Sequence, residues 1–137
     1  MKTAVDSSVL LAIFNDEPDA RAWVQCLIDA RREGQLVVCD AAYAEVAPAF
    51  VAESELQEAL GKLGVAFDAV TAASAWKAGV SFRAYREAGG PRERLIPDFL
   101  IAAHALVQAD RLAAADRGYL RRYFAELPLL APSRGRA

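Results

Sequence analysis

Four carboxylates lie in apolar stretches of the sequence, where a charged side chain is unexpected. They are Asp6 in TAVDSSVLLAIF, Glu45 in AAYAEVAPAFVA, Asp98 in LIPDFLIAA, and Asp116 directly after LAAA. Moving an isolated ionised carboxylate from water into an apolar environment is costly, so such groups are seldom buried unless they are paired or bound to a metal. Each of the four therefore needs a compensating partner.

A divalent cation is the partner that would suit all four acids at once. Carboxylates that converge repel one another unless a cation lies between them. Mg²⁺ and Mn²⁺ prefer oxygen ligands, whereas zinc fits poorly because the only histidine and both cysteines lie elsewhere in the sequence. A cation held in this way polarises a phosphoryl oxygen and activates a bound water. This pattern indicates hydrolysis of phosphodiester bonds.

Helix capping is the alternative explanation for three of the four acids. Asp6, Asp98 and Asp116 each precede or open an expected helical turn, where a short acidic side chain is favoured. Capping does not explain Glu45. His104 lies six residues after Asp98, about 240° away around a helix, so we expect it to pack or to form a hydrogen bond rather than to serve as a general base.

The apolar periodicity predicts alternating strands and helices. The expected strands cover residues 3–5, 36–39, part of 65–70, 112–115 and 129–130, and the expected helices cover 7–14, 16–33, 40–52, 54–64, 71–88, 97–109 and 118–124. Short apolar strands separated by helices are typical of a mainly parallel sheet covered on both faces. The sequence therefore predicts an α/β fold, a three-layer α/β/α sandwich formed by residues 1–132, with a flexible tail at 133–137.

The four acids fall at corresponding places in these elements. Asp6 ends the first strand and Asp116 ends the strand at 112–115, while Asp98 lies in the first turn of its helix and Glu45 lies about one turn into the helix after the second strand. Ligands of parallel sheets bind at the carboxyl ends of the strands. We therefore expect all four side chains to project toward this edge of the sheet.

The charge balance excludes one class of nucleic-acid-binding protein. The chain has 137 residues and a net charge of −2, so it is not a simple polycation that neutralises many phosphates. However, residues 83–137 carry 10 basic and 6 acidic residues, and 13 of the 16 basic residues of the chain are arginine. These arginines form either a phosphate-binding surface or a solvated face paired with glutamates. The candidates for contact with a nucleic acid are Arg92, Arg94, Arg117 and Arg121.

Two further features concern the compartment. Cys26 and Cys39 do not form a Cys-x-x-Cys pair, which favours reduced thiols. The apolar run at residues 9–14 is too short to span a membrane, and Asp6 interrupts the place where a signal peptide would have its apolar core. We expect a cytoplasmic protein.

Four segments together resemble the PIN domain, and in particular the VapC toxins of bacterial toxin–antitoxin pairs. They are MKTAVDSSVLLAIF, AYAEV, RLIPDFLIAAHA and AAADRGYLRRYFAELPLLAP. The resemblance implies a small Mg²⁺- or Mn²⁺-dependent endoribonuclease with an α/β/α sandwich, an acidic active site, a homodimeric assembly and a cognate antitoxin. Carried over position by position, it assigns the catalytic and metal-binding roles to Asp6, Glu45, Asp98 and Asp116.

The sequence departs from the family pattern at two positions. Ala114 stands where the family often has a hydroxyl residue two positions before the last acid, and Pro48 follows Glu45 closely enough to bend its helix. Ser8 could supply a hydroxyl to the metal site or bond to its own helix. The alternative function is a catalytically silent PIN-like binding module whose acidic pocket recognises a protein partner.

Overall fold

A five-stranded parallel sheet forms the centre of the molecule. The computed structural model describes residues 1–90, 96–115 and 118–133. The strands are β1 (Lys2–Val5), β2 (Gln35–Val38), β3 (Val65–Phe67), β4 (Arg111–Ala113) and β5 (Leu129–Leu130). Their order is β3-β2-β1-β4-β5, and every described pair is parallel. The predicted parallel sheet is confirmed.

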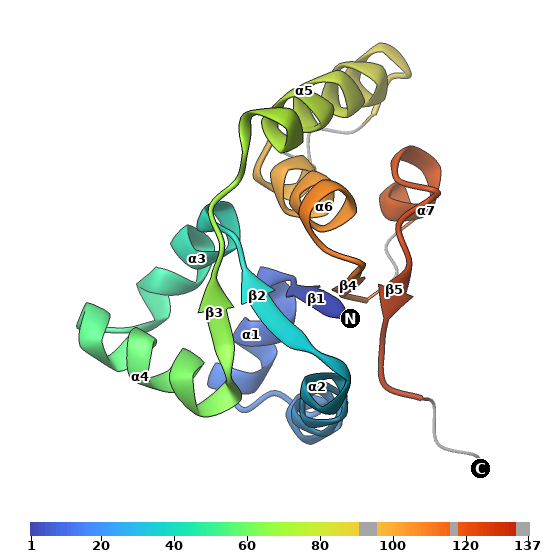
Figure 1. Ribbon diagram of the computed structural model, residues 1–137. Coiled ribbons are helices and arrows are strands. Elements are labelled where there is room, and N and C mark those ends of the chain that lie inside the picture. The colour runs from blue at the N-terminus through green and yellow to red at the C-terminus, as the bar shows by residue number, and fades with distance from the viewer. Residues whose placement is uncertain (91–95, 116–117, 134–137) are drawn as a thin grey trace.

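Helices cover both faces of this sheet (Figure 1). The helices are α1 (Ser7–Phe14), α2 (Ala20–Glu33), α3 (Asp40–Val46), α4 (Glu53–Leu63), α5 (Ala72–Glu87), α6 (Ile96–Gln108) and α7 (Tyr119–Tyr123), with a 3₁₀ turn at Ala47–Ala49. α1 packs on α2 on one side, and α6 contacts β1 and β4 on the other. α5 packs on α6. This arrangement is the predicted α/β/α sandwich.

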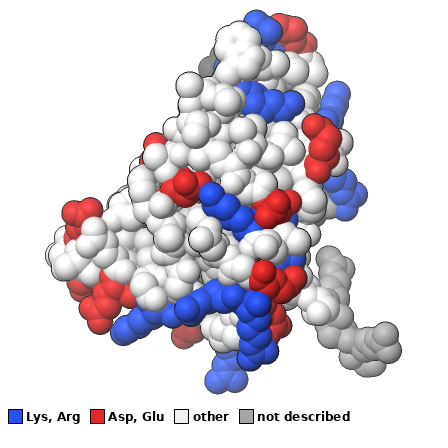
Figure 2. Space-filling view, in the orientation of Figure 1, with Lys and Arg blue, Asp and Glu red and all other residues white. Residues whose placement is uncertain are grey.

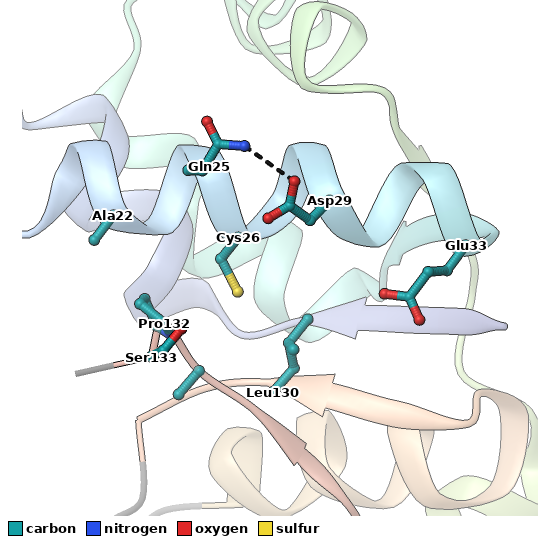
Figure 3. Close-up of a pocket in the computed structure, with 9 residues that line it drawn as sticks. Ala22, Gln25, Cys26, Asp29, Glu33, Leu130, Pro132 and Ser133 are labelled. Carbon is teal, nitrogen blue, oxygen red and sulfur yellow. Dashed lines mark hydrogen bonds between the residues drawn. The ribbon is translucent and has the colours of Figure 1, made fainter. Parts of the chain in front are cut away.

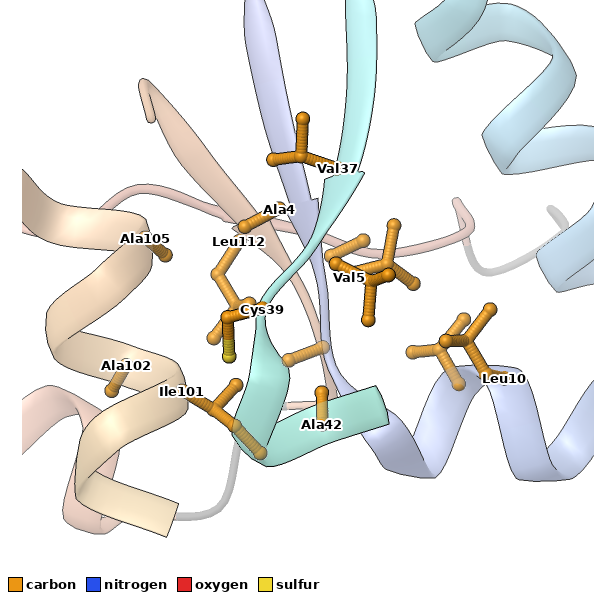
Figure 4. Packing of buried hydrophobic residues seen from close by; sticks show 14 of the residues in the cluster. Ala4, Val5, Leu10, Val37, Cys39, Ala42, Ile101, Ala102, Ala105 and Leu112 are labelled. Carbon is orange, nitrogen blue, oxygen red and sulfur yellow. The ribbon is translucent and has the colours of Figure 1, made fainter. Parts of the chain in front are cut away.

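The alternation of side chains along the strands explains how both faces are buried. Ala4 pairs in register with Val37 on one side and Leu112 on the other, and all three face α6 (Figure 4). Val5, the next residue along β1, points the other way, toward Leu10 of α1. Every one of these side chains is at most 4% exposed. Burial on both faces fixes the register of β1 in the sheet. It therefore also fixes the place of Asp6, which directly follows Val5 at the end of this strand.

An aromatic cluster joins α5, α6 and the C-terminal segment. Phe99 of α6 is fully buried and lies 5.3 Å, ring centroid to centroid, from both Phe82 and Tyr85 of α5. On its other side, Tyr119 and Phe124 lie 5.6 and 5.8 Å away. Such pairs contribute both apolar burial and favourable ring electrostatics. The cluster therefore fixes the start of α6, which carries Asp98.

Two expected helix boundaries were wrong, and proline explains one of them. The helix expected at 40–52 ends at Val46 and continues as a 3₁₀ turn, because Pro48 lacks the N–H that a longer α-helix needs. Asp40 is the first residue of α3 and makes no cap bond; its Oδ1 accepts from the Val70 N–H. The helix expected at 16–33 begins at Ala20, after Asp16 with its φ of 51°.

A partly buried polar network connects α6 to β1 and to the residue after β3. The Nε2 of His104 lies 2.8 Å from Oδ2 of Asp68, which also accepts from Gln108 and pairs with Lys2 at 3.4 Å. His104 is 1% exposed, in line with its expected hydrogen-bonding role. Burial raises the pKa of Asp68, but the His104 hydrogen bond and the Lys2 charge outweigh it and leave the pKa below its usual value. The network therefore favours the ionised carboxylate.

Asp68→Ala should lower the free energy of unfolding by about 1–3 kcal/mol at neutral pH, because it leaves a buried histidine without its acceptor. A depressed pKa stabilises the fold above the unfolded-state pKa of about 3.9, and this contribution is lost as the pH falls toward the folded-state value. Urea unfolding at pH 7 and pH 3 measures both effects. An equal difference between variant and wild type at the two pH values would contradict the assignment.

Among residues 1–90, 96–115 and 118–133, no helix is both long and apolar enough to cross a membrane.

Candidate functional site

The strand order of the sheet reverses between β1 and β4. From β1 the chain moves outward to β2 and β3, whereas β4 and β5 extend the sheet in the opposite direction. Ligands of open parallel sheets bind where the order reverses in this way. The N–H of Asp6 donates to the carbonyl of Ala113, the last residue of β4, at 3.0 Å. Asp6 therefore lies at the reversal point itself.

The Asp6 side chain is buried without capping its helix. Asp6 is 8% exposed and is the N-cap residue of α1, but its side chain makes no capping hydrogen bond. Its Oδ2 instead accepts from the Ser8 hydroxyl at 2.5 Å. Capping thus does not account for this carboxylate, and Ser8 makes its hydrogen bond to the acid itself.

The Glu45 carboxylate forms a hydrogen bond with Ser7 of α1, a residue that the sequence did not assign to the site. The Ser7 hydroxyl donates to Oε1 of Glu45 at 2.8 Å, and Ser7 is itself 8% exposed. Glu45 lies in the last turn of α3, which contacts α1. Since Ser7 directly follows Asp6, this bond links Glu45 to the residue next to Asp6 in the chain. The signal in the sequence was the placement of two hydroxyls immediately after the isolated acid.

Asp98 lies on a third helix, α6, at the same end of the sheet. It is half-buried in the first turn of α6, and α6 contacts α3. Figure 4 shows α1, α3 and α6 converging beyond the ends of β1 and β2. Asp116 lies outside the described residues, as do Arg92, Arg94 and Arg117. Arg121 is exposed on α7.

The donor atoms fit a hard divalent cation. Within residues 1–90, 96–115 and 118–133, no group of three or more Asp, Glu, His or Cys side chains is arranged to hold a metal ion. The described candidates are all carboxylates, and His104 is already bonded to Asp68. Burial raises the pKa of the Cys39 thiol, which disfavours the thiolate that zinc would need. An oxygen-only set matches Mg²⁺ or Mn²⁺.

A cavity of about 310 Å³ lies elsewhere, between α2 and the segment after β5 (Figure 3). Cys26 points into it, and burial raises the pKa of its thiol. Both cysteines are free thiols, as expected. Asp6, Glu45 and Asp98, the candidate carboxylates that the structure describes, do not line this cavity.

Comparison with known families settles the fold family. The model of the PIN domain matches residues 3–125, nearly the whole chain. The chain belongs to the PIN domain family. The matched range of this PIN domain includes the four candidate acids Asp6, Glu45, Asp98 and Asp116.

Two solved structures share the fold of this PIN domain. VapBC2 from Rickettsia felis, crystallised with a DNA fragment from its promoter, matches with a TM-score of 0.72 and 16% identity, covering 94% of this chain and 97% of that one. VapBC-1 from nontypeable Haemophilus influenzae matches with a TM-score of 0.70 and 18% identity, covering 96% and 98%. Among curated proteins, none matched this sequence.

Proposed function

We propose that this PIN domain, formed by residues 1–132, is a cytoplasmic Mg²⁺- or Mn²⁺-dependent endoribonuclease and the toxin of a toxin–antitoxin pair. The observation that carries the proposal is the buried carboxylate of Asp6 at the strand-order reversal, with Glu45 bonded to the adjacent residue Ser7. Both similar structures are VapBC assemblies, which supports an antitoxin partner. The family resemblance supports a homodimer.

Asp6, Glu45, Asp98 and Asp116 would hold the cation. When bound, the cation polarises a phosphoryl oxygen and lowers the pKa of a coordinated water, the chemistry that phosphodiester hydrolysis requires. The protein contributes the orientation of the ligands: Ser8 holds Asp6, Ser7 holds Glu45, and the Phe99 cluster fixes the helix of Asp98.

RNA would be held by arginines rather than by overall charge. Arg121 projects from α7 near the C-terminal part of the chain, where the basic residues outnumber the acidic ones. Arg92, Arg94 and Arg117 would complete this surface. The guanidinium fork suits phosphate, and such contacts position the strand without reading its sequence.

Growth on expression distinguishes the enzyme from the binding module. We expect expression of the native chain to arrest growth and Asp98→Asn to relieve the arrest, because the amide cannot replace an anionic metal ligand. Immunoblotting controls for equal protein levels. Equal growth with both forms would instead support a silent module whose acidic pocket recognises a protein.

Ser7→Ala is expected to reduce RNA cleavage by about 10–100-fold, the usual effect of removing a group that orients a metal ligand. Because the lost hydroxyl only positions Glu45, raising the Mn²⁺ concentration should recover part of the activity. Ser7→Thr, which keeps the hydroxyl, is the matched control. Cleavage by Ser7→Ala at the wild-type rate at limiting Mn²⁺ would show that the bond has no such role.

A further inference from the structure

The line of contact between α5 and α7 is built from aromatic rings of the cluster around Phe99, and we call it the α5–α7 seam. The rings of Tyr85 in α5 and Tyr123 in α7 lie 5.5 Å apart, edge to face. Phe99 lies 6.2 Å from the Tyr123 ring and 5.3 Å from the Phe82 ring. Phe99 directly follows Asp98 in the first turn of α6. The seam therefore begins one residue from a candidate metal ligand.

Two arginines lie over rings on the two sides of this seam. The Cζ of Arg86 is 5.8 Å from the centroid of the Phe82 ring, and the Cζ of Arg122 is 5.5 Å from that of the Tyr123 ring. Both arginines are exposed. A ring face attracts a guanidinium at this distance, so the rings restrict where each charge lies. In Figure 2, basic side chains lie over the α5 and α7 part of the molecule, at the upper right of the view.

The two guanidinium groups are available for an external anion. Within the part of the chain that the structure describes, neither Arg86 nor Arg122 forms a salt bridge. The acid next to Arg86 in the chain, Glu87, instead pairs with Arg83 at 3.8 Å. A guanidinium has five N–H donors and no acceptor, so an exposed one without a carboxylate partner favours the binding of an anion.

A nucleic-acid strand is the ligand that would use both arginines at once. They lie on different helices on the two sides of the seam, so the phosphates of one strand can contact both. The planar fork of a guanidinium suits phosphate oxygens, and such contacts position a strand without reading its bases. A strand lying along the seam would reach Asp98, because the seam begins beside it.

We propose that Arg86 and Arg122 bind backbone phosphates of the RNA substrate where the strand lies on the α5–α7 seam beside Asp98. The inference rests on the proposed ribonuclease function, and it adds two arginines to those that the sequence indicated. A chain that binds RNA through these arginines without cleaving it would overturn the activity alone. A chain that cleaves RNA but binds it equally well without these arginines would overturn this phosphate site alone.

Binding of a fluorescently labelled oligouridine tests the site. Fluorescence anisotropy in EDTA, over a series of KCl concentrations, gives the association constant without metal-dependent cleavage. Arg86→Gln and Arg122→Gln should each weaken binding about fivefold in ~0.1 M KCl. Each should also reduce the slope of log K against log salt by about 0.7, the value for one phosphate contact on a single strand.

Arg32→Gln is the matched control, because it removes an arginine whose side chain is 76% exposed on α2, away from the seam. We expect it to leave both the affinity and the salt slope unchanged. Circular dichroism verifies that all variants are folded. Wild-type affinity in both seam variants, or an equal loss of affinity in Arg32→Gln, would overturn the proposal.

Arg86→Lys separates the charge from the planar fork. Lysine keeps the positive charge, so the salt slope should stay at the wild-type value, while the affinity falls by less than in Arg86→Gln. A lysine variant with the slope and affinity of Arg86→Gln would overturn a contact with phosphate. Tighter binding of oligoglutamate than of oligouridine, lost in the same two variants, would assign the seam to an acidic protein and equally overturn the proposal.

Discussion

Asp6→Asn is expected to abolish cleavage of RNA, with a loss of at least about a hundredfold. Groups that merely orient a metal ligand already contribute 10–100-fold, so the loss of a ligand should cost no less. Asp6 is the most buried of the described candidate acids and lies where the strand order reverses, between the paired strands β1 and β4. Initial rates of cleavage of purified total RNA, with Mn²⁺ present, measure the effect.

The same variant should fold at least as stably as the wild type. A largely buried carboxylate without a bound cation carries a desolvation cost, and the isosteric amide removes that cost. Asp29→Asn is the matched control, since it removes an acid whose side chain is 57% exposed on α2, and we expect it to leave the cleavage rate unchanged. Full activity of Asp6→Asn would remove Asp6 from the site.

Phe99→Ala should lower the free energy of unfolding by about 3–5 kcal/mol, the usual cost of removing a buried phenylalanine ring. Phe99 is 0% exposed and contacts rings from α5 and from the segment after β4, so the cavity would open between three parts of the chain. Since a domain is stable by only about 5–15 kcal/mol, much of the protein would unfold near physiological temperature. Thermal and urea unfolding followed by circular dichroism give the value.

Phe99→Leu separates loss of volume from loss of fold. Leucine keeps most of the apolar volume, so it should cost clearly less than alanine and leave the cleavage rate near that of the wild type. If Phe99→Ala lost less than about 1 kcal/mol, the aromatic cluster could not be what fixes the start of α6.

Periodicity and composition predicted most of the fold, because the strands are buried on both faces and the helices are well marked. Thr71 caps α5 by accepting from the Ser74 N–H, and Gly64 ends α4 in the left-handed region, both as their residue types suggest. The end of α3 was predicted incorrectly. Its apolar pattern continues through residue 52, and the single missing N–H of Pro48 overrides that pattern.

The positions of Asp6, Glu45 and Asp98 in their helices and strands were predictable from the sequence, because the rule that ligands bind at the carboxyl ends of parallel strands requires only the strand ends. The Ser7–Glu45 hydrogen bond was not, because it joins residues 38 positions apart and depends on how α3 packs against α1. The His104–Asp68 bond is similar: its acceptor lies 36 positions away, and Asp68 carries no signal of its own in the sequence. Long-range side-chain partners follow from packing, which one sequence does not specify.

The most direct test of a metal-dependent ribonuclease is cleavage of purified total RNA by the wild-type chain with Mn²⁺, with EDTA, and after Mn²⁺ is restored in excess over EDTA. Asp6→Asn, purified in the same way, shows whether any cleavage comes from a contaminating nuclease. The proposed function predicts discrete fragments with Mn²⁺, none with EDTA, recovery on restoration, and none with the variant. Cleavage that persists in EDTA, or that the variant shares, would contradict it.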